Sequence, residues 1–182
     1  MPTAPSKPQK PRAQALMVSE ATGKYGGYRA SAYRPGGMHK FVDSVVRATP
    51  YEMVDIERRG VHGRLVKDLA KSLQLPAARV FSILGIPKAT AEKKAASGTA
   101  LTGSAGRAAL GMVKLLGLAQ AIVASSDSPD AKGFDTSKWL GQWIERPQPA
   151  LGGRKPADLL DTPTGAELVS RLLGAIESGA YQ

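Results

Sequence analysis

Two apolar helical faces, separated by a glycine–proline elbow, constrain the C-terminal part of this 182-residue chain more than any other feature. Thr162 can cap a helix that starts at Pro163, a position where the missing N–H of proline has no cost. Apolar residues then recur with the spacing of one α-helical face, which we predict to be buried: Leu168, Val169, Leu172, Leu173 and Ile176. Gly179 is the predicted C-cap.

The segment before this helix repeats the pattern. A helix predicted to begin near Asp135 or Thr136 places Trp139, Leu140, Trp143 and Ile144 on one face. The intervening residues are rich in proline and glycine, which predicts a rigid bend: Pro147, Pro149, Gly152, Gly153 and Pro156. A small two-helix module is therefore expected over residues 135–182.

A known pattern matches this module in order and spacing. The matching residues are Trp139-Leu140, Pro149 to Pro156 (PALGGRKP), Leu159-Leu160, Asp161 to Gly165 (DTPTG), Val169, Leu172, Leu173, Ile176 and Gly179. In these positions the module resembles the C-terminal domain of the Xre/MbcA/ParS antitoxins, the partners of RES-domain toxins. The resemblance implies a toxin that consumes NAD or transfers ADP-ribose, and an antitoxin whose C-terminal end covers the active site of that toxin.

Carried onto this chain, the resemblance implies toxin contacts near its end, at Arg171, Glu177, Ser178, Gly179, Ala180 and Tyr181. At the elbow two interpretations stay open: Arg154 and its neighbours either add contacts to the toxin or only shape the fold. A tail that ends at a capped helix is free to enter a cleft, where Tyr181 can stack and form a hydrogen bond.

The composition excludes several classes of protein. The chain has no cysteine, which rules out disulfides, zinc–thiolate sites and cysteine nucleophiles. No uninterrupted apolar run approaches the ~20 residues of a membrane helix, and the N-terminus lacks a signal-peptide core. A soluble, cytoplasmic protein without a membrane partner is the expectation.

Charge is distributed unevenly along the chain. Residues 1–40 carry a net charge of +6 (seven basic, one acidic), residues 41–124 also +6 (twelve and six), and residues 125–182 carry −2 (six and eight), which sums to +10. A basic front and an acidic rear suggest a polyanion at one end and a different partner at the other. An equally open interpretation is a solvated basic surface without a ligand.

Residues 1–37 are predicted to form a basic extension, because prolines and glycines alternate there with lysine, arginine and tyrosine. Interleaved cations and aromatic rings can hold nucleic acid by charge and stacking. The favoured alternative is an extension that does little or packs on the core of its own chain.

Helical patterns continue from residue 38. A short helix is predicted between Met38 and Tyr51 with one apolar side (Phe41, Val42, Val45 and Val46), whereas residues 51–60 fit either a helix or a turn-rich connection. Three short helices follow between His62 and Gly98, the last of them basic and poor in apolar residues. This arrangement fits a helix-turn-helix unit, whose last helix enters the major groove.

The predicted DNA contacts lie on that last helix. Lys88, Lys93 and Lys94 would meet phosphates or guanine edges, and Thr90 a base edge or phosphate. The alternative is an ordinary solvated helix face. The antitoxin family also carries an Xre-type helix-turn-helix ahead of its C-terminal domain, and the resemblance extends, more loosely, to Ile86–Thr90 and Lys93-Lys94. Lysine suits phosphate better than bidentate reading of guanine, so base specificity is the weaker part of the prediction.

The longest helical pattern covers residues 102–124 and contains Gly111 and Gly117, which we expect to allow close helix–helix approach. Residues 125–134 are a polar linker. The expected fold is therefore all-α, with the basic extension (1–37), a helix-turn-helix-like bundle (38–124), the linker (125–134) and a small helical C-terminal domain (135–182).

No catalytic constellation is apparent. His39 and His62 lack partners at metal-ligand spacing, and the glycine pairs do not form a phosphate-binding loop, so no metal, cofactor or enzymatic activity is predicted. The leading hypothesis is an antitoxin that binds operator DNA, represses its own operon and neutralises a RES-domain toxin, as a homodimer or a larger hetero-oligomer with the toxin. The alternative is a stand-alone helix-turn-helix regulator whose C-terminal module only dimerises it.

Overall fold

The computed structural model describes residues 32–177, and all of their side chains except those of Asp130, Ile176 and Glu177. The helices are α1 (Met38–Val46), α2 (Pro50–Arg59), α3 (Leu65–Ser72), α4 (Ala77–Ile83), α5 (Lys88–Ser97), α6 (Gly103–Ala124), α7 (Thr136–Ile144) and α8 (Pro163–Glu177). Two-residue strands, β1 (Val61–His62) and β2 (Ala100–Leu101), pair antiparallel with Val61 opposite Leu101. The predicted all-α fold is confirmed.

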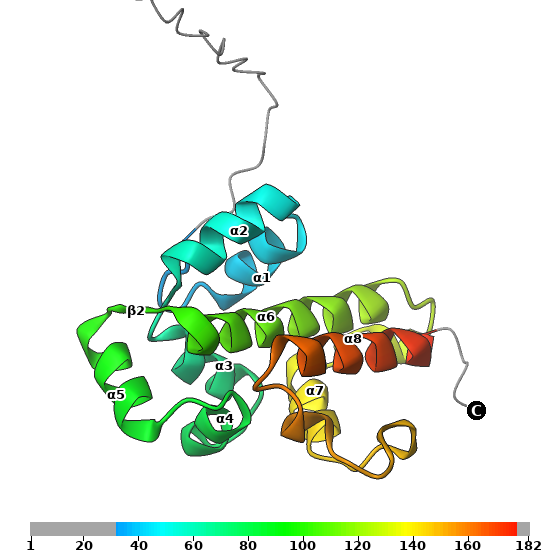
Figure 1. The fold of residues 1–182 in the computed structure, drawn as a ribbon. Helices are drawn as coiled ribbons and strands as arrows, with labels where there is room; N and C mark the ends of the chain where they lie inside the picture. Colours follow the sequence, from blue (N-terminus) through cyan, green and yellow to red (C-terminus); the bar gives the residue numbers. More distant parts are fainter. Residues whose placement is uncertain (1–31, 178–182) are drawn as a thin grey trace, which may run out of the picture.

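Helix α6 is the centre of the molecule. Figure 1 shows α1 and α2 on one side of it, α3, α4 and α7 on the other, and α8 alongside it. Its buried residues are therefore not confined to one stripe, and they include Ala108, Ala109, Leu110, Met112, Val113, Leu115, Leu116 and Ala119. A helix enclosed on several sides is expected to be apolar around most of its circumference.

The sequence analysis expected no apolar stretch long enough to cross a membrane, and α6 corrects that expectation. Helix α6 has 22 residues and a mean hydropathy of 1.5 over its most apolar window, so by length and composition it could cross a membrane. Half of that window is buried inside the protein. Packing against the neighbouring helices accounts for the apolar composition of α6.

Capping residues at both ends define helix α2. Thr49 caps α2 in a capping box with Glu52: the Glu52 N–H donates to Thr49 Oγ1 (3.3 Å) and the Thr49 N–H donates to Glu52 Oε2 (2.8 Å). Pro50 occupies the first turn, and Gly60 ends the helix with φ +76°. The segment that the sequence left undecided, residues 51–60, is thus helical through Arg59.

Three glycines lie where neighbouring elements approach a helix closely. A Cβ atom on Gly117 would lie 2.3 Å from Val46 Cγ2 of α1, and one on Gly111 would lie 3.2 Å from Ala166 Cβ of α8. A Cβ on Gly141 of α7 would lie only 2.1 Å from the carbonyl oxygen of Leu73, at the end of α3. The expected close approach at Gly111 and Gly117 is confirmed.

The apolar face of α8 is narrower than predicted. Val169, Leu172 and Leu173 are buried against the core, but Leu168 is 47% exposed, so its predicted burial is wrong. Helix α8 contacts α6 along one stripe, and Leu168 lies at the edge of that stripe. Val46, on the predicted apolar side of α1, is 53% exposed, although its Cγ2 lies against Gly117 of α6.

One continuous apolar core joins the residues before and after the predicted linker at 125–134. It extends from Phe41 and Leu65 through Leu116 to Leu140 and Leu173. The predicted cap of α8 is confirmed, since the Gly165 N–H donates to Thr162 Oγ1 at 3.1 Å. The predicted C-cap at Gly179 lies outside the described residues.

The Gly141 contact predicts a specific loss of stability. Gly141→Ala should lower the free energy of unfolding by about 1–3 kcal/mol, because the new methyl group would overlap a backbone carbonyl that cannot rotate away. Gly174→Ala is the matched control on α8, where no atom lies within 4 Å of an added Cβ. There alanine should be neutral or stabilising by up to about 1 kcal/mol, since it favours helix. Equal effects of the two substitutions in urea unfolding would contradict the packing described here.

Candidate functional site

Helix α5 presents the predicted DNA-binding residues at the surface. It starts after Pro87, and Gly98 ends it with φ +67°, as the sequence predicted. Only Ala91 is buried, so the helix contacts the core through a small area. Lys88, Thr90 and Lys93 are exposed.

Lys94 differs from the other predicted residues. Its side chain is partly buried, and its ammonium group donates to the carbonyl oxygen of Ala100 in β2 at 2.9 Å. A Cβ on Gly63 would lie 2.5 Å from the Lys94 carbonyl carbon and oxygen, so the end of α5 packs directly on the turn before α3. Lys94 therefore has a structural role in fixing α5, whatever its role at a surface.

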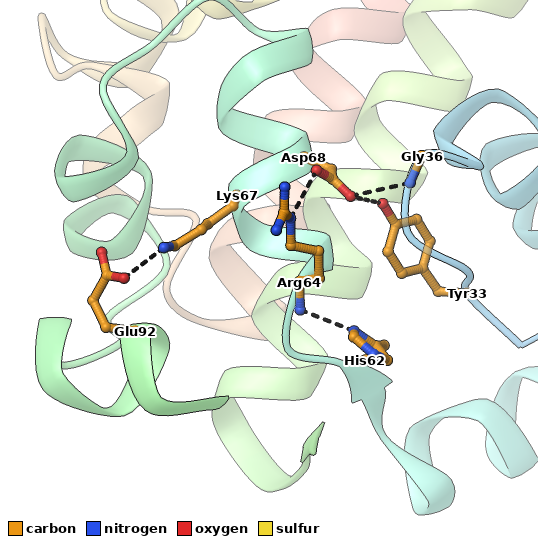
Figure 2. Close-up of polar contacts among 7 residues, drawn as sticks. All are labelled: Tyr33, Gly36, His62, Arg64, Lys67, Asp68 and Glu92. Carbon is orange, nitrogen blue, oxygen red and sulfur yellow. Dashed lines mark hydrogen bonds and ion pairs between the residues drawn. The ribbon is translucent and has the colours of Figure 1, made fainter. Parts of the chain in front are cut away.

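Helix α3 supports α5 from behind. Lys67 of α3 forms an ion pair with Glu92 of α5 at 2.5 Å (Figure 2), in which both side chains are about one-third to two-fifths exposed (34% and 43%). The pair neutralises the acidic residue of α5, so the exposed side chains of the helix are left with a net positive charge.

The carboxylate of Asp68 ties the segment before α1 to α3. It accepts hydrogen bonds from the Tyr33 hydroxyl and from the Gly36 N–H (3.3 Å), and Arg64 lies 3.4 Å away (Figure 2). Burial and the neighbouring carboxylate raise the pKa of Tyr33, which stays protonated as the donor. Tyr33 also packs edge-on against Phe41, with 5.2 Å between ring centroids. Residues 33–37, at the end of the predicted extension, are thus attached to the core.

An aromatic row marks the C-terminal half. Phe134, Trp139 and Trp143 follow one another with ring centroids 6.2 and 6.0 Å apart, and the two tryptophans are stacked. The Asp135 carboxylate caps α7 by accepting from the Lys138 N–H at 2.9 Å. An open apolar hollow of about 240 Å³ lies beside this row, lined by Ala119, Ile122, Val123, Phe134, Trp139 and Leu173.

Backbone hydrogen bonds hold the elbow in shape. The Gln148 N–H donates to the Arg154 carbonyl and the Gly153 N–H to the Gln148 carbonyl, both at 3.0 Å. Gly152 and Gly153 have φ values of +63° and +79°, which favour glycine. The turn leaves the Arg154 side chain exposed.

An ion-pair network joins this elbow to α4. Arg79 donates to both carboxylate oxygens of Glu145, at 2.5 and 3.0 Å, and Lys155 lies 3.5 Å from the same carboxylate. The Arg79 hydrogen bonds are the main cause of a lowered pKa of Glu145, and Glu145 in turn raises the pKa of Arg79. Sequence analysis missed these residues, because Arg79 and Glu145 are 66 positions apart and no periodic pattern links them.

The predicted toxin-binding residues are only partly within the described chain. Arg171 is exposed and forms an ion pair with Glu167 of its own helix. The backbone of Glu177 ends α8, whereas Ser178, Gly179, Ala180 and Tyr181 lie outside the described residues. Among the side chains that the structure describes, no group of three or more His, Asp or Glu residues is arranged to hold a metal ion.

Comparison with known proteins adds to this geometry. Residues 133–179 match the family described as "Antitoxin Xre/MbcA/ParS C-terminal toxin-binding domain". The match covers α7, the elbow and α8 together. Over 138 residues the chain is also 37% identical to the "Prs ADP-ribosylating antitoxin" of Sphingobium sp. (strain YBL2), an alignment that covers 76% of this chain and 86% of that relative.

The Arg79–Glu145 pair predicts a pH-dependent contribution to stability. A carboxyl group whose pKa falls on folding stabilises the folded protein above its unfolded pKa of ~4.3. This contribution disappears as the pH falls through the lower folded value. Glu145→Gln should therefore lower the free energy of unfolding at pH 7 by about 1 kcal/mol, with solvent screening included.

The same substitution should flatten the decline in stability below pH 5, measured by urea unfolding at several pH values. Glu167→Gln is the matched control, because the Arg171–Glu167 pair is 72% and 62% exposed. The control should change stability little at any pH. A pH profile of the Glu145 variant that parallels the wild type would contradict the assigned role.

Proposed function

The chain belongs to the Xre/MbcA/ParS family of antitoxins and carries the toxin-binding domain of that family at residues 133–179, and we propose that it neutralises a RES-domain toxin while also binding operator DNA. The observation that carries the proposal is the match of the toxin-binding domain to one structural unit, α7, elbow and α8. The toxin would consume NAD or transfer ADP-ribose. The name of the Sphingobium relative, which refers to ADP-ribosylation, supports the transfer reaction.

The C-terminal end of the chain is the proposed inhibitory element. Val169, Leu172 and Leu173 fix α8 along α6, so the core sets the position of the end of this helix. We place Glu177, Ser178, Gly179, Ala180 and Tyr181 in the active-site cleft of the toxin, with Arg171 at its rim. The apolar hollow beside Phe134 and Trp139 offers further contact area to a partner seated on the end of α8.

The proposed DNA surface is the exposed side of α5. Lys88 and Lys93 would bind phosphates and Thr90 a phosphate or base edge, with Lys94 holding α5 in place through Ala100. The exposed basic side chains and the Lys67–Glu92 pair behind them support this assignment. Binding there would repress the antitoxin's own operon, in the cytoplasm, with the protein acting as a homodimer or in a larger complex with its toxin.

The DNA surface can be tested with lysines that the fold does not need. The double variant Lys88→Ala/Lys93→Ala should bind operator DNA more weakly. It should also reduce the slope of log affinity against log salt by about 1.8, or about 0.9 per lost phosphate contact. Lys132→Ala is the control, because this exposed lysine lies in the segment between α6 and α7. Gel-shift titrations at several salt concentrations that give the double variant a wild-type slope would place DNA binding elsewhere.

The inhibitory end can be tested by truncation. Removal of Gly179–Gln182 should weaken protection of cells from the toxin and restore NAD consumption or ADP-ribose transfer in a purified complex. Operator binding should persist, since α5 lies in a different part of the fold. The toxin to use is the product of the adjacent gene, co-expressed and recovered by pull-down. If the truncated protein protects cells fully, the end has no inhibitory role. If no toxin is recovered with the full chain, the stand-alone regulator is favoured.

A further inference from the structure

The end of α2 and the start of α6 meet at the ribbon formed by β1 and β2. A Cβ on Gly60, the residue after α2, would lie 2.3 Å from the Leu101 carbonyl oxygen. One on Gly106 would lie 2.6 Å from the same oxygen and 4.0 Å from the Gly60 Cα. We call residues 57–62 and 100–107 the ribbon corner. Its backbone is too closely packed to shift, and Figure 1 shows α5, β2 and the start of α6 together at the left of the view.

The surface of the ribbon corner carries three exposed arginines. Arg58 and Arg59 are the last residues of α2, and Arg107 lies near the start of α6. Neither Arg58 nor Arg107 forms an ion pair within the part of the chain that the structure describes. The Nε of Arg59 donates to the Asp55 carbonyl oxygen at 3.2 Å, so the two terminal nitrogens of its guanidinium remain available. Three cations are thus presented to solvent without a carboxylate partner.

The acidic residues nearby do not cancel this charge. Glu57 of α2 lies 3.8 Å from the ammonium group of Lys114, which neutralises it. Arg107 and Glu57 line the same open hollow of about 320 Å³, which places Arg107 beside the last turn of α2. Four basic side chains are set against two acidic ones, a net charge of +2: Arg58, Arg59, Arg107 and Lys114 against Asp55 and Glu57. Such a surface attracts a polyanion.

The ribbon corner and α5 are held in one fixed arrangement. The Lys94 ammonium group of α5 donates to the Ala100 carbonyl at 2.9 Å, and the Gly63 N–H donates to the Thr99 carbonyl at 3.1 Å. Helix α5 has ten residues and is about 15 Å long, somewhat more than the ~12 Å width of the major groove. The N-terminal residues of a recognition helix contact the bases. The C-terminal end of α5, and the ribbon that follows it, therefore reach the sugar–phosphate backbone at the edge of the groove.

We propose that the ribbon corner is a second DNA-binding surface, at which Arg58, Arg59 and Arg107 bind phosphates along the edge of the groove that α5 occupies. The inference rests on the proposed DNA binding by α5 and adds a separate site to it. Guanidinium groups suit this role, because they bind phosphate through two parallel hydrogen bonds. Contacts of this kind fix the position of α5 in the groove and carry no sequence information.

Removal of the two arginines without an ion pair tests the ribbon corner in the full chain. Arg58→Gln/Arg107→Gln should lower the slope of log affinity against log salt by about 1.8, at about 0.9 per lost phosphate contact. Affinity for operator and for random duplex should fall by the same factor, since phosphates are common to both. Arg47→Gln/Arg146→Gln is the matched control, because it removes the same charge from exposed arginines that follow α1 and α7. Circular dichroism shows whether each variant is folded.

The outcomes separate this inference from the proposed function. If the arginine variant matches its control while Lys88→Ala/Lys93→Ala still weakens binding, the ribbon corner is not a DNA surface and α5 remains one. Wild-type chain that binds neither duplex overturns both.

Shortened duplexes test where the phosphates lie. Stepwise trimming of the operator from each end should weaken binding by the wild-type chain at lengths where the Arg58→Gln/Arg107→Gln variant loses nothing, because the variant no longer uses the flanking phosphates. Gel-shift titrations give both affinities at each length. Parallel loss of affinity by wild type and variant as the duplex is trimmed would contradict a contact at the edge of the groove.

Discussion

The enclosure of α6 is the constraint on which the rest of the structure depends. This helix contacts α1, α2, α7 and α8, and its burial on several sides explains its apolar composition and the glycines at positions 111 and 117. Residues before and after the predicted linker share the core that it forms. Separation of the two parts would expose the apolar surface of α6, which is costly at roughly 25 cal/mol per Å². The polar segment after Ala124 therefore lies between two parts of one folded unit, each with one of the proposed surfaces, and not between two independent cores.

The features that could be predicted from the sequence are those encoded locally. Thr162 and Pro163 start α8 and Gly98 ends α5, each by acting on residues next to it in the chain, and both helix ends lie where the sequence predicts them. Helix α2 stayed undecided because Ile56 is its only fully buried residue, which leaves no periodic apolar stripe to detect. The error at Leu168 has a similar cause: periodicity gives the direction of a helical face, but its width is set by the neighbouring helix.

Interactions between distant residues could not be predicted from a single sequence. Nothing in the local pattern distinguishes Glu145, which binds Arg79 through both carboxylate oxygens, from Glu167, whose ion pair is with Arg171 of its own helix. The same limit applies to the predicted DNA-binding lysines. They have equal weight in the sequence, yet the ammonium group of Lys94 is bonded to Ala100 while Lys88 and Lys93 are exposed. Tertiary structure thus separates lysines that hold α5 from lysines that are available to a ligand.

The segment from Glu145 to Asp161, which contains the elbow, packs against α4 and the turn that follows α4. Glu145 pairs with Arg79 of α4 and with Lys155 of the elbow, and Gln74 donates to the α7 cap Asp135 at 3.2 Å. A Cβ on Gly85 would lie 3.2 Å from Asp161 Cβ. Gly85 belongs to the tight turn that leads from α4 into α5. A toxin that contacts Arg154 would therefore lie on a segment joined to α4, the helix before the proposed DNA-binding helix. Because the bidentate Arg79–Glu145 pair and backbone contacts fix this region, such a toxin would affect DNA binding by its own bulk and charge rather than by moving α5.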